Sequence, residues 1–326
     1  MPLLSVCLTL TITIYLHNRM NPQVSHSLLA ALAKVEQKAR CTRLQRMLYN
    51  PYKYVVAMTH RELIYPKHKQ EKLVTTGLFF DNKMKIALPA AIDIYLTGGK
   101  THSSELRLAK YLIKQLESKA AFLDIGAHFG YYTMLAATLV GEAGRVFSFE
   151  PTNKSFDLLL SNTAAMPQVT LCQCAVSNNE NSMDFYEFQT LYSEYNSSDI
   201  TQYKDEVWFQ KSTPTKITIP STTIDIMTAT HSFFPVMIKI DVEGAEDKVI
   251  SGGLRYFETH SPIIIMEYVE PKRNNVPHHT ACTLLKKSGY SSFSINEDAT
   301  LSALLDIDTY LQLHQLESDN IVFKKK

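Results

Sequence analysis

The region from Phe122 to Glu150 limits most strongly what this chain can fold into. It reads as an apolar run, a tight loop that contains Gly126 and Gly130, a helical stretch, and a second apolar run that ends in Glu150. A strand, a short loop, a helix and a second strand in this order form the repeating unit of a parallel α/β sheet. Because ligands of such sheets bind at the carboxyl ends of the strands, we expect the loop and Glu150 to form one binding site.

The residue at the start of this loop, Asp124, indicates which ligand binds there. A dinucleotide-binding loop has the pattern G-x-G-x-x-G, which lets the amides of a helix N-terminus meet a pyrophosphate. Asp124 stands in the place of the first glycine, and its negative charge would repel a pyrophosphate. S-adenosylmethionine (SAM) instead carries an ammonium group, a sulfonium, a ribose and no phosphate, and Glu150 could accept hydrogen bonds from the ribose hydroxyls. The alternative for so short a motif is an ordinary strand-to-turn segment.

A second cluster of acids follows the apolar run that begins at Pro235. Asp241, Glu243 and Gly244 come directly after this run, and a helix follows them. Acids at the carboxyl end of a strand are expected to face the ligand site. The alternative is that Glu243 and Glu246 occupy the first turn of the helix, where the helix dipole favours acids. That alternative suits Glu246 well and Asp241 poorly. Lys239, inside the run, is expected to form an ion pair with a neighbouring acid.

These segments together resemble the FkbM family of SAM-dependent methyltransferases. The resemblance rests on Leu123–Tyr132, Phe149–Pro151, Ser221–Asp225 and Lys239–Glu246, and it extends over roughly residues 75 to 325. One departure is His128, which stands where the family usually has Asn. Since Asn and neutral His can both donate and accept one hydrogen bond, binding is expected to survive this change.

The resemblance implies an α/β fold with a Rossmann-like, seven-stranded SAM methyltransferase sheet, helices on both faces, and an antiparallel last strand. SAM is the expected cofactor, and a hydroxyl of a small molecule, sugar or glycan is the expected acceptor. The residues expected to bind SAM are Asp124, Gly126, Ala127, His128, Gly130, Tyr131, Glu150 and Asp241. Asp241 and Glu243 are the expected catalytic residues. Asp241 and Glu267 could hold Mg²⁺, but two carboxylates are too few, so we expect no metal.

Other functions remain open at this point. The same fold could transfer the methyl group to nitrogen or carbon, or could bind SAM without turnover. A nicotinamide oxidoreductase has a similar fold but is disfavoured by Asp124.

The rest of the chain predicts two parts. Residues 1–71 are expected to form a mostly helical extension, and residues 72–326 a methyltransferase domain that begins with a hairpin of two strand-like runs, Leu73–Phe80 and Met84–Pro89. The sheet strands are expected at 121–125, 145–149, 168–174, 235–241, 262–268, 290–295 and 319–323, with a helical stretch at 300–315. Residues 178–220 form a β-rich, aromatic insertion, which is either a lid over the site or a hairpin extension of the core.

Composition bears on partners and location. The formal net charge is +1, which gives no general attraction to nucleic acid or to anionic membranes. The five cysteines have no zinc or disulfide spacing and favour a reducing compartment. The apolar run Leu3–Leu16 is too short to span a membrane and has no basic residues before it, as a signal peptide would. It is an accessory strand or, as we slightly favour, it precedes a true start at Met20; a secretory signal is a minor alternative. We therefore expect a cytoplasmic protein with no nucleic-acid partner, no stable membrane insertion, and an oligomeric state that the sequence does not give.

Overall fold

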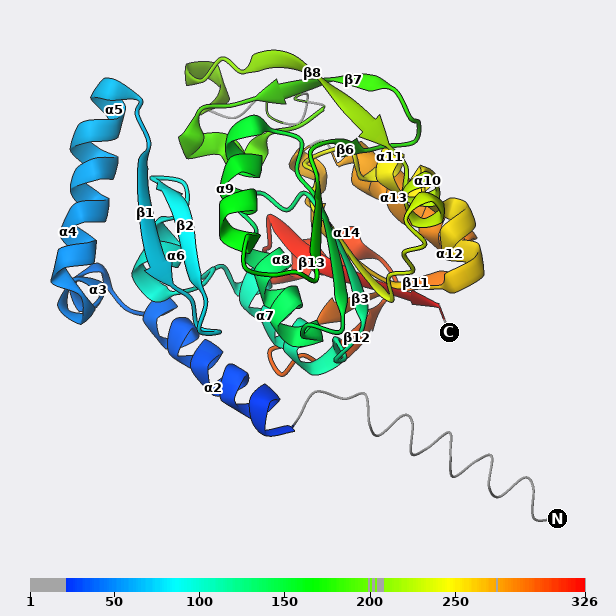
Figure 1. Ribbon diagram of the computed structural model, residues 1–326, viewed down its shortest axis with the longest axis horizontal. Helices are drawn as coiled ribbons and strands as arrows, with labels where there is room; N and C mark the ends of the chain where they lie inside the picture. The colour runs from blue at the N-terminus through cyan, green and yellow to red at the C-terminus, as the bar shows by residue number, and fades with distance from the viewer. Residues whose placement is uncertain (1–21, 199, 201–202, 204–207, 274, 326) are drawn as a thin grey trace.

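A computed structural model of the protein describes residues 22–198, 200, 203, 208–273 and 275–325 (Figure 1). The two alternatives for the run Leu3–Leu16, an accessory strand or a segment before a start at Met20, lie outside these residues. None of the helices in the described part of the chain combines the length and the apolar composition that crossing a bilayer would require.

The centre of the protein is an eight-stranded, mostly parallel sheet with the order β12-β11-β13-β10-β9-β3-β4-β5. Its strands are β3 (Ala121–Ile125), β4 (Arg145–Phe149), β5 (Val169–Cys172), β9 (Met237–Ile240), β10 (Ile263–Val269), β11 (Tyr290–Ile295), β12 (Leu301–Leu304) and β13 (Ser318–Lys325). Strands β3, β4, β5, β9 and β10 run parallel, and β13 pairs antiparallel with both β10 and β11. The predicted α/β, Rossmann-like fold with an antiparallel last strand is confirmed.

The prediction of seven strands is wrong, because residues 301–304 add an eighth strand at the edge of the sheet. Ala299 adopts a left-handed backbone conformation, and the N–H of Asn296 donates to the carbonyl of Thr300. This tight turn sends the chain back along β11, so β12 pairs antiparallel with it. The helix expected at 300–315 is therefore limited to α14 (Ile307–His314), which begins where the Asp306 side chain accepts the N–H of Thr309 at 2.7 Å.

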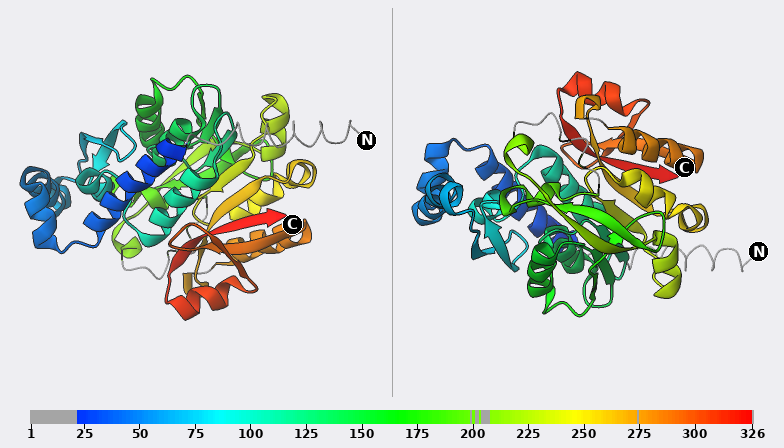
Figure 2. Two further views of the ribbon diagram at one scale, coloured as in Figure 1. Left: turned by 90° about the horizontal axis from the view of Figure 1, so that it is seen from below. Right: turned by 90° about the horizontal axis from the view of Figure 1, so that it is seen from above.

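Helices cover both faces of the sheet (Figures 1 and 2). They are α7 (Ser103–Gln115), α8 (Tyr131–Val140), α9 (Asn153–Thr163), α10 (Ile224–Thr230), α11 (Glu246–Ser251), α12 (Leu254–His260) and α13 (Val276–Lys287). Successive strand residues point to opposite faces, so Phe122 joins one buried apolar cluster and Leu123 joins the other. The first cluster contains α7 and α8, and the second contains α10 to α13. Both faces of the central strands are therefore dry, as a parallel sheet requires.

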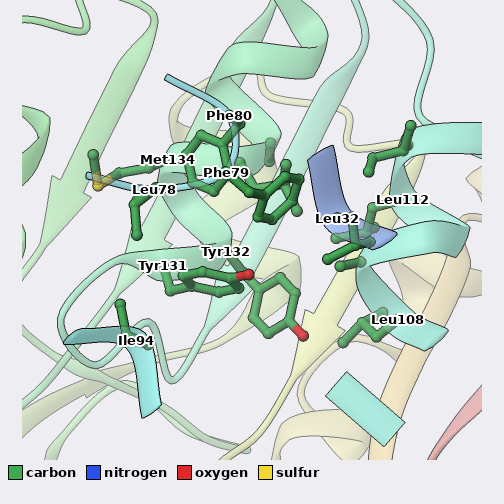
Figure 3. Packing of buried hydrophobic residues seen from close by; sticks show 14 of the residues in the cluster. Leu32, Leu78, Phe79, Phe80, Ile94, Leu108, Leu112, Tyr131, Tyr132 and Met134 are labelled. Carbon is green, nitrogen blue, oxygen red and sulfur yellow. The ribbon is translucent and has the colours of Figure 1, made fainter. Parts of the chain in front are cut away.

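The N-terminal part packs against the first of these clusters. It consists of α2 (Pro22–Ala39), α3 (Arg43–Tyr49), α4 (Pro51–Thr59), a π-helical turn η1 (His60–Ile64), α5 (Tyr65–His68), the hairpin β1 (Lys72–Gly77) and β2 (Lys83–Leu88), and α6 (Ile92–Thr97). The strands β1 and β2 pair antiparallel, which confirms the predicted hairpin. Figure 3 shows Leu32 of α2 beside Leu108 and Leu112 of α7, and all three side chains are fully buried.

The insertion at 178–220 contributes most of a separate small sheet. Its strands are β6 (Ala175–Val176), β8 (Thr215–Thr222) and β7 (Ser182–Glu187), in the order β6-β8-β7. A 3₁₀ turn, η2 (Thr190–Tyr195), follows β7, and η4 (Phe209–Lys211) precedes β8. Aromatic side chains between the strands pack on one another, with Trp208 stacked on Tyr192 at 4.6 Å between ring centres. The insertion therefore has a small core of its own.

Candidate functional site

A cavity of about 400 Å³ lies at the carboxyl ends of β3, β4, β9 and β10. Eight of the predicted site residues line it: Asp124, Gly126, Ala127, His128, Tyr131, Glu150, Asp241 and Glu243. The sequence segments that carry them are about a hundred residues apart, and the strand order β4-β3-β9 brings them together. Their roles in binding and catalysis remain predictions.

The loop after β3 passes so close to β9 that only glycine fits at its turn. Gly126 has a φ of +82°, and a Cβ atom there would lie 1.8 Å from the carbonyl oxygen of Asp241. The N–H groups of Gly126 and Ala127 both donate to the carbonyl of Phe149, at 3.0 and 2.9 Å. The loop is therefore fixed between the ends of the two neighbouring strands, which leaves the space above it for a ligand.

Gly130, unlike the other predicted residues, does not line the cavity. It has a φ of +92° at the start of α8, and a Cβ atom there would lie 2.6 Å from a methyl group of Leu159. This glycine therefore serves the packing of α8 against α9. A direct contact with the cofactor has no support from its position.

Asp124 is fully buried in the wall of the cavity. One carboxylate oxygen accepts a hydrogen bond from Thr133 at 2.7 Å, and the other lies 3.9 Å from the ammonium group of Lys239. That second oxygen has no hydrogen-bond donor among the described residues. Burial raises the pKa of Asp124. A ligand that brings a positively charged donor would satisfy this oxygen.

Glu150 lies at the end of β4 with both carboxylate oxygens in hydrogen bonds. One accepts the N–H of His128 at 2.9 Å, and the other accepts the N–H and the hydroxyl of Thr152 at 3.0 and 2.6 Å. These bonds fix the side chain in one orientation. Burial nevertheless raises the pKa of Glu150 to about 7, because few water molecules can solvate its charge.

His128 occupies a position that few residue types tolerate. Its φ is +50°, in the left-handed region, where Asn and His are more common than most other residues. This conformation explains why a His can replace the Asn of the family. Burial and the nearby Lys100 lower the pKa of His128 to about 3, so the ring is neutral at physiological pH. Its Nε2 atom lies 3.0 Å from the Ser193 hydroxyl.

Three carboxylates gather at the ends of β9 and β10. Oxygen atoms of Asp241, Glu243 and Glu267 lie within 4.8 Å of one another. Lys239 donates to Asp241 at 3.0 Å, which confirms the predicted ion pair of this lysine. Glu243 has a φ of +55° and accepts a hydrogen bond from the Tyr203 hydroxyl at 2.7 Å.

The three carboxylates differ in proton affinity. Burial works against the charge of Asp241, but the ammonium groups of Lys239 and Lys100 lower its pKa below the usual value. Burial, and then the charges of Glu267 and Asp241, raise the pKa of Glu243. Burial and Asp241 also raise the pKa of Glu267 to about 8. The charge of Asp241 is therefore favoured, whereas burial and the neighbouring carboxylates increase the proton affinity of Glu243 and Glu267.

Sequence reasoning missed a group of residues that the N-terminal elements bring to the cavity. Lys100, after α6, lies 2.9 Å from Glu105 of α7, and Glu105 accepts a hydrogen bond from Tyr132 at 2.8 Å. The ammonium groups of Lys100 and Lys239 lie 5.4 and 5.3 Å from the centre of the Tyr132 ring. The pair Gly98-Gly99 before Lys100 is a turn signal that could have directed attention to this lysine.

The insertion forms one side of the cavity. Ser193, Glu194, Asn196 and Ser198 line it, and Ser193 lies within hydrogen-bond distance of His128. The hydroxyl of Ser197 donates to the carbonyl of Glu243. The insertion therefore contains a hairpin of β7 and β8 and also lines the cavity, and its role as a lid stays a prediction.

The chain is similar to solved structures of methyltransferases and to one family model. The FkbM methyltransferase of Methylobacillus flagellatus is 17% identical, with a TM-score of 0.40 over 72% of this chain and 52% of that one. The chain thus spans about half the length of that structure. The precorrin-6y C5,15-methyltransferase of Geobacter metallireducens is 14% identical, with a TM-score of 0.37 over 68% of this chain and 87% of that one.

None of the curated proteins matches this chain. The family model gives the decisive comparison. The family model of the methyltransferase FkbM domain matches residues 124–292, from Asp124 in β3 to Ser292 in β11. Because this match covers just over half of the 326 residues, the chain belongs to the FkbM methyltransferase family.

Proposed function

We propose that this protein binds SAM and transfers its methyl group to a hydroxyl oxygen of a small molecule, a sugar or a glycan. The observation that carries the proposal is the meeting of Asp124, Glu150 and Asp241 in one cavity at the ends of three adjacent strands. Asp124 lies near the end of β3, and Glu150 and Asp241 follow β4 and β9, so together they suit a ligand with a ribose and positively charged groups. The choice of oxygen rests on the resemblance to the FkbM family.

The residues of the cavity fit SAM. The buried oxygen of Asp124 that lacks a hydrogen-bond donor among the described residues suits the ammonium group. Glu150 suits the ribose hydroxyls, and Gly126 lets the loop pass close to the backbone of Asp241 at the end of β9. The neutral state of His128 avoids a cation beside the sulfonium. SAM supplies an activated methyl group when it is bound.

The protein must then orient the acceptor and remove its proton. Holding the acceptor oxygen in line with the methyl group provides most of the rate enhancement. A hydroxyl has a high pKa, so a base that accepts its proton assists the attack. Glu243 suits this role, because burial and its neighbours raise its pKa and make its carboxylate a stronger base than that of Asp241. Asp241, held by Lys239, suits the orientation of the acceptor.

Methyl transfer from radiolabelled SAM tests this proposal directly. The purified protein should label at least one member of a panel of sugars, glycosides and phenols, and mass spectrometry should locate the methyl group on oxygen. Amine acceptors form a second panel, and labelling confined to them would favour transfer to nitrogen. A protein that fails to bind SAM in calorimetry, while it binds NAD, would contradict the proposal.

Replacement of Glu150 tests the cofactor site. Glu150→Ala should weaken SAM binding by about 1.5–3 kcal/mol, the range for hydrogen bonds to a charged group. Calorimetry measures the effect, and Glu142→Ala, at an exposed position before β4, is the matched control. Unchanged SAM affinity in the Glu150 variant would remove this residue from the site.

Replacement of the strand-end acids tests catalysis. Asp241→Asn and Glu243→Gln should retain the fold and most of the SAM affinity but lower single-turnover methyl transfer by at least about tenfold each, toward the loss expected for a positioned base. The two effects should add incompletely if both acids orient one acceptor. Glu258→Gln, exposed on α12, should leave the rate unchanged. Full rate in both variants would assign the base to Glu267 or His128.

A further inference from the structure

An exposed apolar surface lies on the helices α3, α4 and η1, and none of its residues lines the cavity. It consists of Leu44, Leu48, Tyr49, Tyr52, Val55, Leu63 and Ile64, which we call the docking face. Their exposed fractions range from 41% for Ile64 to 76% for Tyr52. Large apolar side chains on short amphipathic helices are normally turned toward a core, so this arrangement indicates a surface that something else covers.

The spacing of these residues places them on shared helix sides. Leu44 and Leu48 are four residues apart on α3, and Tyr52 and Val55 are three apart on α4. Among the residues that the structure describes, the other exposed large apolar side chains are scattered over seven parts, from α2 to α14. Within this described part, the docking face alone collects seven such side chains in 21 consecutive residues.

The docking face lies in the most basic part of the protein. Residues 40–72 contain eight Lys or Arg and two Glu, whereas the rest of the chain contains 25 Lys or Arg and 30 Asp or Glu. The net charge of +1 therefore hides a strong separation of charge. Arg43 and Arg61 are exposed on α3 and η1, and Lys67 is exposed on α5, the helix that follows η1. Figures 1 and 2 show these helices at one end of the molecule, where they stand apart from the central sheet.

We propose that the docking face binds peripherally to the surface of an anionic lipid membrane. An amphipathic helical surface with Leu and Tyr on one side and Lys and Arg around them can bury its apolar side chains among acyl chains while its cations meet lipid phosphates. Tyrosine suits this boundary because its ring is apolar and its hydroxyl is polar. The protein would lie on the bilayer and would not cross it.

Charge complementarity favours a membrane over a second copy of this chain. In a two-fold symmetric dimer the same surface meets itself, so the excess of basic over acidic residues around the docking face would repel the same excess on the other copy. An anionic bilayer instead neutralises these cations. Nucleic acid would also neutralise them, and Tyr49 and Tyr52 could stack on bases, but the aliphatic side chains of Leu44, Leu48 and Val55 would not be buried against a polar phosphate backbone.

Co-flotation of the full-length protein with vesicles tests this proposal. Vesicles that contain phosphatidylglycerol should carry the protein, vesicles of phosphatidylcholine alone should carry much less, and added salt should reduce the binding. The double variant Leu48→Asp/Tyr52→Asp should reduce the vesicle-bound fraction at least about tenfold. Arg43→Glu/Lys67→Glu should reduce it by a similar factor, because each cation near the surface contributes to binding.

The controls change equally exposed residues elsewhere. Leu305→Asp/Leu313→Asp, at 98% and 76% exposure, and Lys286→Glu/Lys287→Glu at the end of α13 should leave vesicle binding unchanged. Thermal unfolding should be the same for all four variants, since every replaced side chain is exposed.

Three results would overturn the proposal. The first is a full-length protein that does not float with anionic vesicles, and the second is an equal loss of flotation in the controls. The third is a self-association, measured by sedimentation, or an RNA affinity that the docking-face variants abolish while vesicle binding stays unchanged.

Discussion

Gly126→Ala should abolish detectable SAM binding and destabilise the fold by more than about 3 kcal/mol, an effect reserved for severe steric conflict. The new Cβ atom would lie 1.8 Å from the carbonyl oxygen of Asp241, and the residue has a φ of +82°. The loop cannot move away easily, because its N–H groups are bound to the carbonyl of Phe149 at the end of β4. Either the hydrogen bonds of the loop or the end of β9 must give way. Urea unfolding and calorimetry with SAM measure the two effects.

Gly77→Ala provides the matched control for this substitution. Gly77 ends β1, and a Cβ atom there would meet no atom within 4 Å. Its replacement should change stability by less than about 0.5 kcal/mol, as is usual at unconstrained positions. If the Gly126 variant binds SAM as the wild type does, the close approach of the loop to β9 does not shape the site.

Lys239→Met should destabilise the protein by about 3–5 kcal/mol at neutral pH, the cost of leaving buried charges without a partner. Only 2% of Lys239 is exposed, and its ammonium group pairs with Asp241 and lies near the fully buried Asp124. Although burial works against the charge of Lys239, these two carboxylates raise its pKa above the usual value. Its contribution to stability is therefore fully present below pH 10.5 and is lost only as the pH rises through the higher pKa of the folded state.

The pH dependence separates this electrostatic effect from a simple loss of packing. In the Met variant, Asp124 is left as a buried carboxylate whose pKa burial has already raised. Lowering the pH protonates this group, so the gap in unfolding free energy between variant and wild type should narrow in acid. The same substitution should also cost less in an Asp124→Asn background. A penalty that stays constant across pH and background would show that Lys239 acts through packing alone.

The sequence predicted those strands that begin or end at a glycine loop or at an acidic residue. The strands at 121–125 and 145–149 were predicted at their observed bounds, because one apolar run ends at a glycine loop and the other ends at Glu150. Strand β12 was missed because residues 301–304 lie inside the segment 300–315, which was predicted to be helical. Its stability comes from pairing with β11 and from the turn at Ala299, and neither is visible in the periodicity of the sequence.

Some residues of the candidate site could be predicted from the sequence and others could not. Asp124, Glu150 and Asp241 could be predicted because each lies at or next to the end of an apolar strand, and ligands of parallel sheets bind at the carboxyl ends of the strands. Lys100 and Glu105 come from α6–α7, outside the alternating strands and helices. The packing of α7 on the sheet brings them to Tyr132, and a single sequence gives no signal for such a contact.

The place of β13 in the sheet has a consequence for how the chain folds during synthesis. This strand lies between β10 and β11, although both precede it in the sequence. Until residues 318–325 leave the ribosome, one edge of β10 has no partner strand. Until then β11 and β12 could join the sheet only by pairing with β10 directly, which is a strand order that the folded protein does not have. Open strand edges of this kind promote aggregation. We therefore expect the nascent protein to depend on chaperones until its last strand is made, and ribosome-bound chains stalled before Ser318 should aggregate more than released ones.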